Sequence, residues 1–125
     1  MADIVFIHGL QGSFFSTWMV QQPSTDYHHV VCWPAAYLPA YLTKDGKLPP
    51  IRILSVGYHA RMMKSSSPHP TLSIKEQASD LRSQLESAGI GEKPVIFVTH
   101  SMGGLIVKEM LVEDSKWGAV RACEV

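Results

Sequence analysis

The chain has 125 residues with 11 acidic and 11 basic side chains, and it contains no basic run or basic helix face, so a nucleic-acid partner is not expected. Its hydrophobic content of 46% is too high for a disordered segment, and its length predicts one domain with its own core. No apolar run approaches the roughly 18 residues needed to span a bilayer, and no signal-peptide pattern opens the chain.

The first predicted element is a buried strand at residues 3–8, whose apolar run Ile4–Ile7 leads directly into a loop that begins His8-Gly9. In α/β-hydrolases, the loop after the corresponding strand donates one backbone N–H to an oxyanion hole. A phosphate-binding alternative is weaker, because the loop lacks the lysine and the spacing of a P-loop. We expect His8 to be structural rather than a general base.

Residues 13–50 carry weaker patterns. A short helix is expected to open at residues 13–20, with its aromatic side chains in the core. Residues 21–50 are rich in loop signals, and a weak strand candidate lies at residues 30–32. The stretch 33–42 is apolar enough to lie against the core. The two cysteines, Cys32 and Cys123, have no metal spacing and are interpreted as reduced thiols of an intracellular protein.

A middle strand is predicted at residues 51–58, followed by a polar surface loop at residues 59–70. The clearest helix then begins at Ser73, which forms a capping box with Glu76, and is expected to end at Gly89. The residues of its predicted apolar face are Ile74, Ala78, Leu81, Leu85 and Ala88. Four histidines in predicted loops lack zinc-site spacing, so no metal or cofactor is expected: His28, His29, His59 and His69.

The last predicted strand, residues 95–98, runs into Thr99-His100-Ser101-Met102-Gly103-Gly104. This order is typical of a nucleophile elbow, G-x-S-x-G, in which a serine occupies a sharp turn between a strand and a helix. Thr99 replaces the first glycine of that pattern. The alternative interpretation is a serine that caps a helix. The helix that follows is expected to turn Met102, Leu105, Ile106, Met110 and Leu111 inward.

Strands that alternate with helices predict a parallel sheet in a three-layer α/β/α fold with right-handed crossovers. Ligand sites in such sheets lie at the carboxyl ends of the strands. The loop that begins at His8-Gly9 and the turn at Ser101 are both expected at that edge.

Four stretches carry a resemblance to a known family: VFIHGLQGSFFSTW, CWPAAYLP, RILSVGYHA and PVIFVTHSMGGLIVKEML. Together they resemble the lipase-like domain of serine active site-containing proteins, a family similar to the inositol-deacylase and lipase branch of the α/β-hydrolases. The resemblance covers residues 3–113 and leaves 115–125 as a divergent tail. Residues 1–125 are therefore expected to form a single, partial α/β-hydrolase domain.

The resemblance implies that Ser101 is the nucleophile and that the backbone N–H groups of Leu10 and Met102 form the oxyanion hole. The residues that would support the two motifs are His8, Gly9, His100, Gly103 and Gly104. It further implies hydrolysis or transfer of an acyl ester related to lipids, and association with mitochondrial and endoplasmic reticulum membranes. That association would be peripheral, because no transmembrane segment is visible. The sequence does not define a protein partner.

A serine nucleophile needs a base and an acid, which follow it in the order Ser, Asp or Glu, His in α/β-hydrolases. No histidine follows Ser101 here, and Glu109, Glu113 and Asp114 lie on or just past the elbow helix. His100 is adjacent to the serine and is not expected to serve as its base. Two hypotheses result: a serine esterase whose downstream half is absent from this chain, or an inactive fragment that binds lipids or a partner.

Overall fold

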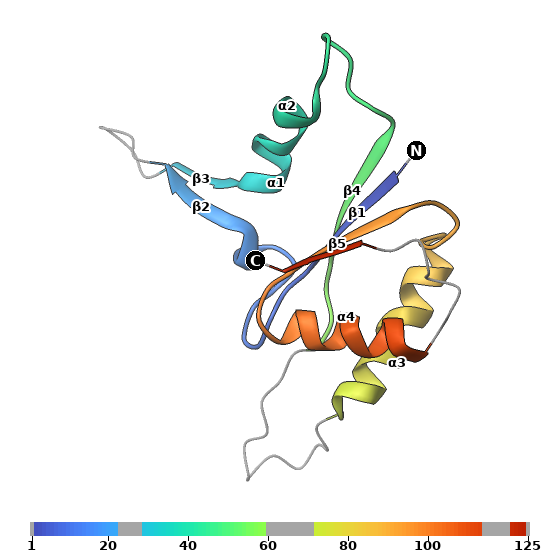
Figure 1. Ribbon diagram of the computed structural model, residues 1–125. Coiled ribbons are helices and arrows are strands. Elements are labelled where there is room, and N and C mark those ends of the chain that lie inside the picture. The colour runs from blue at the N-terminus through green and yellow to red at the C-terminus, as the bar shows by residue number, and fades with distance from the viewer. Residues whose placement is uncertain (1, 23–28, 60–71, 114–120, 125) are drawn as a thin grey trace.

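The computed structural model describes residues 2–22, 29–59, 72–113 and 121–124. Figure 1 shows the elements in chain order. They are β1 (Ala2–Ile7), the 3₁₀ turn η1 (Ser16–Trp18), β2 (Met19–Gln22), β3 (His29–Cys32), α1 (Trp33–Ala36), α2 (Leu38–Leu42), β4 (Ile51–Val56), α3 (Ile74–Ser87), β5 (Val95–Thr99), α4 (Met102–Glu113) and β6 (Arg121–Glu124). Of the loop predicted at 59–70, only His59 belongs to the described residues, and His28 lies outside them.

The main sheet has the strand order β4-β1-β5-β6, and every neighbouring pair is parallel. Val5 of β1 is the register partner of Leu54 in β4 on one side and of Phe97 in β5 on the other. The sequence therefore predicted the parallel α/β class correctly. Strand β6 was not predicted, since it comes from the tail that matched no pattern, and it pairs with β5 from Ile96↔Arg121 to Thr99↔Glu124.

Each face of the sheet has its own apolar cluster, because successive side chains of a strand point to opposite faces. Val5 and Ile7 of β1 pack toward helices α3 and α4. Ile4 and Phe6 pack on the other face with Trp18, Trp33 and neighbouring side chains of β3, α1 and α2. Figure 1 shows the corresponding layers, with the β2–β3 hairpin and α1–α2 on one side and α3–α4 on the other.

Helix α3 begins as predicted. The Ser73 hydroxyl accepts the Glu76 backbone N–H at 3.2 Å, and the Glu76 carboxylate accepts the Ser73 N–H at 2.7 Å. Gly89 follows the helix with φ 73°, and Ile90 donates its N–H to the Leu85 carbonyl. Of the predicted apolar face, Ala78, Leu81 and Leu85 are buried. Ile74 and Ala88, at the first position and the C-cap of the helix, are exposed.

Two further expectations are wrong. The short helix expected at residues 13–20 is reduced to one 3₁₀ turn, because Met19 and Val20 pair with Cys32 and Val31 in an antiparallel hairpin. Of its aromatic residues only Trp18 is buried, whereas Phe14 and Phe15 are more than half exposed. Leu105 of α4 is 50% exposed, although Ile106 and Met110 are buried as predicted.

Candidate active site

The carboxyl ends of β1 and β5 lie side by side in the sheet, where Ile7 is the register partner of Thr99. The chain leaves β1 toward the hairpin on one face and leaves β5 toward α4 on the other. Such a point, where neighbouring connections diverge to opposite faces, is where open parallel sheets hold their ligands. The His100 N–H donates to the Ile7 carbonyl at 3.0 Å, which fixes the two loop origins against each other.

Ser101 occupies the sharp turn between β5 and α4, and its φ is 54°. This left-handed conformation is uncommon for residues other than glycine and costs about 1–2 kcal/mol. Ser101 therefore lies in a sparsely populated backbone region, at the sharp turn between strand and helix. A serine that caps a helix normally has extended backbone angles, so the capping alternative does not fit. The Ser101 hydroxyl is exposed and makes no hydrogen bond within the described residues.

Gly103, two positions after the serine, allows helix α4 to approach the end of strand β1 closely. A Cβ at Gly103 would lie 2.6 Å from the Ile7 carbonyl oxygen and 2.7 Å from that of His8. Both neighbours are backbone atoms of β1 and the residue after it, and they cannot move aside without moving the sheet. Gly104, also buried, donates its N–H to the Ser101 carbonyl at 3.0 Å and so closes the first turn of α4.

The loop after β1 is a tight turn in which Gly12 donates its N–H to the Gly9 carbonyl at 3.2 Å. Gln11 has φ 56° at the third position of this turn, a place usually taken by glycine. Within the described residues, the backbone N–H groups of Leu10 and Met102 donate to no protein acceptor. Met102 is the first residue of α4, where N–H groups are left without helical partners. These are the two N–H groups that the family resemblance implies as oxyanion donors, and no protein acceptor in the described residues occupies either.

His8 is buried and held by its surroundings. Its Nδ1 lies 2.9 Å from the Gly9 carbonyl oxygen, and its ring stacks on Tyr58 with centroids 4.4 Å apart. The Tyr58 hydroxyl donates to the His8 carbonyl at 2.6 Å, and burial raises the pKa of Tyr58 to about 12, so this donor stays protonated. These contacts support the structural interpretation of His8.

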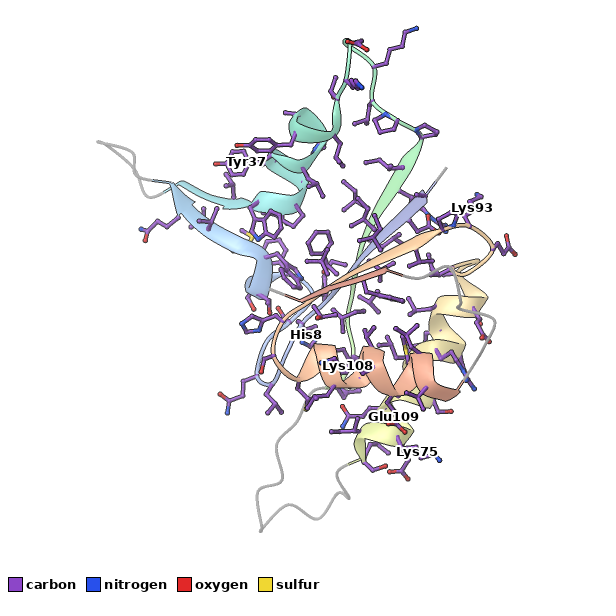
Figure 2. All side chains as sticks on the ribbon, viewed as in Figure 1. His8, Tyr37, Lys75, Lys93, Lys108 and Glu109 are labelled. Atoms are coloured by element: carbon purple, nitrogen blue, oxygen red, sulfur yellow. The ribbon has the colours of Figure 1, made fainter. Side chains whose placement is uncertain are left out.

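No base or acid contacts the Ser101 hydroxyl within the described part of the chain. His100 is exposed, and its ring lies toward Gly9 instead, with Nδ1 3.1 Å from where a Gly9 Cβ would stand. Figure 2 shows His8 where β1 ends and α4 begins, whereas Glu109 lies farther along α4. The described residues also contain no cluster of three potential metal ligands.

A cavity of about 390 Å³ lies beside the loop after β1, and sequence analysis did not anticipate it. His8 and Tyr58 line it together with Asp80 and Gln84 from α3, but Ser101 does not. The available signal was the i, i+4 spacing of Asp80 and Gln84, two polar side chains on the flank of α3 beside the buried Leu81. The apolar pattern of α3 predicted only its packing face.

The fold and the site together define a parallel α/β protein with an exposed serine at a strand-to-helix turn. No protein-family model matches the chain, and no solved structure matches it. The chain is similar to curated proteins named Protein SERAC1: it is 38% identical to those of Bos taurus and Homo sapiens, over 92% and 91% of its length, and 37% identical to that of Danio rerio over 92%. It spans 18% of the length of each of these relatives.

None of the helices in the described residues has the length and apolar character needed to cross a bilayer.

Proposed function

We propose that this chain is part of an α/β-hydrolase domain whose nucleophile is Ser101. The observation that carries the proposal is the left-handed backbone of an exposed serine at the switch point of the sheet. A strained conformation at such a place costs stability, and strain of this kind is concentrated at functional sites. The serine in the α/β-hydrolase motif occupies the same kind of strand-to-helix turn.

The proposed reaction is hydrolysis of an acyl ester, or transfer of its acyl group. The Ser101 oxygen attacks the carbonyl carbon, and the N–H groups of Leu10 and Met102 stabilise the negative charge on the carbonyl oxygen. A base must accept the proton of Ser101, and an acid must orient that base. Since no described residue does so, we place both groups outside the described residues.

The proposed substrate is a lipid-related ester, and the proposed site of action is a membrane surface of mitochondria or the endoplasmic reticulum. Both rest on the resemblance to serine active site-containing proteins. The exposed side chains of Phe14 and Phe15, which follow the candidate oxyanion loop, are compatible with contact to a lipid surface. No metal or cofactor has a role in the proposed chemistry.

A second candidate function is a catalytically inactive module that binds lipid or a partner. The observation in its favour is the Ser101 hydroxyl, which has no hydrogen-bond partner in the described residues. In subtilisin, a serine hydrolase of a different fold, loss of the triad costs on the order of 10⁶ in kcat. In this hypothesis, the loop after β1 and the turn at Ser101 have a structural role only.

A fluorophosphonate probe, which reacts with activated serines, distinguishes the two candidates. We expect slow labelling and near-background hydrolysis of a p-nitrophenyl ester by the 125-residue chain. A chain extended to the length of the relatives should be labelled rapidly, and Ser101→Ala should abolish labelling in both. An unlabelled extended chain would refute the esterase proposal and favour the inactive module. Rapid ester hydrolysis by the short chain, lost in Ser101→Ala, would place a base within it, and His8→Ala would then be the next variant.

A further inference from the structure

The cavity beside the loop after β1 has walls from three separate parts of the chain. His8 and residues 12–14 form one wall, residues 57–59 after β4 form a second, and Asp80 with Gln84 of α3 forms a third. Its volume of about 390 Å³ lies within the range of small-molecule sites, roughly 300–1,000 Å³. It is therefore large enough for a polar head group rather than a single ion.

The lining has a definite charge. Asp80 contributes a carboxylate, and the described residues that line the cavity include no lysine or arginine. One Asp80 oxygen accepts the side-chain N–H of Gln84 at 2.9 Å, which restrains the carboxylate at the rim. Asp80 forms no ion pair within the described residues. A cation is attracted to this lining, and an anion such as a phosphate is repelled.

Two aromatic rings belong to the same lining. Tyr58 is fixed by its stacking on His8, and the Phe14 ring lies 3.0 Å from the position of a Cβ at Gly57. A methylated ammonium group is recognised by aromatic faces together with a carboxylate, because the ring quadrupole attracts a weakly hydrated cation. We infer that this cavity is a binding site for an ammonium group, carried by a small molecule or a head group.

The position of the cavity relates it to the candidate active site. His8 and Gly12 line the cavity, while Gly9 of the same loop packs against Ser101. The loop 8–12 therefore has the cavity on one side and the serine on the other. The ammonium group would belong to the ester that Ser101 attacks, and this step rests on the proposed function. The binding site itself does not depend on the proposed function.

The test is a titration of the 125-residue chain with choline at pH 8, above the ordinary range of histidine titration. Two-dimensional NMR would follow the backbone amides of Gly12, Gly57 and His59 and the side-chain amide of Gln84. We expect saturable shifts at these positions. The neutral isostere 3,3-dimethylbutan-1-ol, which has the shape of choline without its charge, should bind at least about fivefold more weakly.

Asp80→Asn should raise the Kd for choline about fivefold, which corresponds to roughly 1 kcal/mol. Gln84→Lys places a cation at the rim and should abolish binding. Asp45→Asn is the matched control, since Asp45 is an exposed carboxylate in a turn before β4 and does not line the cavity. It removes the same charge and should leave the Kd unchanged.

Ser101→Ala should bind choline like the wild-type chain, so this result is independent of whether Ser101 is a nucleophile. Absent shifts, equal affinity for the neutral isostere, or equal effects of Asp80→Asn and Asp45→Asn would each overturn the inference. Choline binding with no fluorophosphonate labelling of the extended chain would leave the site in place and refute only the esterase proposal.

Discussion

Gly9 lies directly against Ser101, although 92 positions separate them in the chain (101 − 9). A Cβ at Gly9 would lie 2.8 Å from the Cβ of Ser101 and 2.7 Å from the backbone carbonyl oxygen of His100. The loop that carries one candidate oxyanion donor and the turn that carries the serine thus meet without space for a methyl group. The relative position of the donor and the serine depends on this contact.

Gly9→Ala should therefore displace the serine turn. The closest atom is a backbone oxygen and cannot rotate away, so we expect a loss of stability of about 1–3 kcal/mol and slower fluorophosphonate labelling of Ser101 in the extended chain. Denaturant unfolding and labelling rates measure the two effects. Gly46→Ala is the control for the labelling rate, because a Cβ there meets no atom within 4 Å. Its φ of 72° makes alanine costly in stability, but labelling of Ser101 should not change. Labelling that survives Gly9→Ala would show that the contact is not required.

The left-handed backbone of Ser101 should affect the stability of variants at this position. Ser101→Gly removes the penalty of the left-handed backbone, whereas Ser101→Ala removes the hydroxyl and keeps the penalty. We expect the glycine variant to be more stable than the alanine variant by about 1 kcal/mol, after the greater freedom of glycine in the unfolded chain is included. Both variants should be unreactive with the probe. Equal stability of the two would contradict the strained conformation.

The core under α3 provides a third prediction. Leu85 is 2% exposed and packs in the cluster between α3, α4 and the sheet, so Leu85→Ala should cost about 2–5 kcal/mol. Val112→Ala on α4 also shortens an aliphatic side chain, but Val112 is 83% exposed and the change should cost less than about 0.5 kcal/mol. Denaturant midpoints of the two variants give the comparison. A similar cost for both would mean that α4 is covered in solution.

A fourth prediction concerns pH. Arg52 binds both oxygens of the buried Asp3 carboxylate at 2.8 Å and donates to the Ala88 carbonyl at 3.3 Å, so it connects β1, β4 and the end of α3. Its guanidinium holds the pKa of Asp3 below the usual 3.8. This contribution to stability is complete above about pH 4 and is lost as the pH falls through the lowered pKa.

Asp3→Asn should therefore lower stability at pH 7, and the difference from wild type should shrink as the pH falls below 4. Thermal unfolding at a series of pH values measures this convergence. Asp45→Asn, which changes an exposed carboxylate, should leave the pH profile of unfolding close to that of the wild type. An undiminished difference at pH 2–3 would mean that folding does not lower the pKa of Asp3.

Local patterns determined several elements from the sequence alone. The apolar runs at Ile4–Ile7 and Val95–Val98 predicted the two central strands, because near-continuous apolar runs are typical of strands in a parallel sheet, although Ile96 is 37% exposed. Ser73 and Glu76 predicted the start of α3, since a capping box is complete within four residues. The sharp turn at Ser101 followed from the position of the serine between an apolar strand run and the glycine pair Gly103-Gly104. Each of these signals is short-range.

The tertiary structure decided what depends on distant partners. Residues 19–22 became a strand because residues 29–32 pair with them, and residues 121–124 became one because β5 offered a free edge. Leu105 is exposed although its sequence pattern is that of a core position, because burial depends on what covers a helix face. Likewise, the cavity is formed by segments that meet only after folding, and no local pattern in any one of them encodes the space between all three.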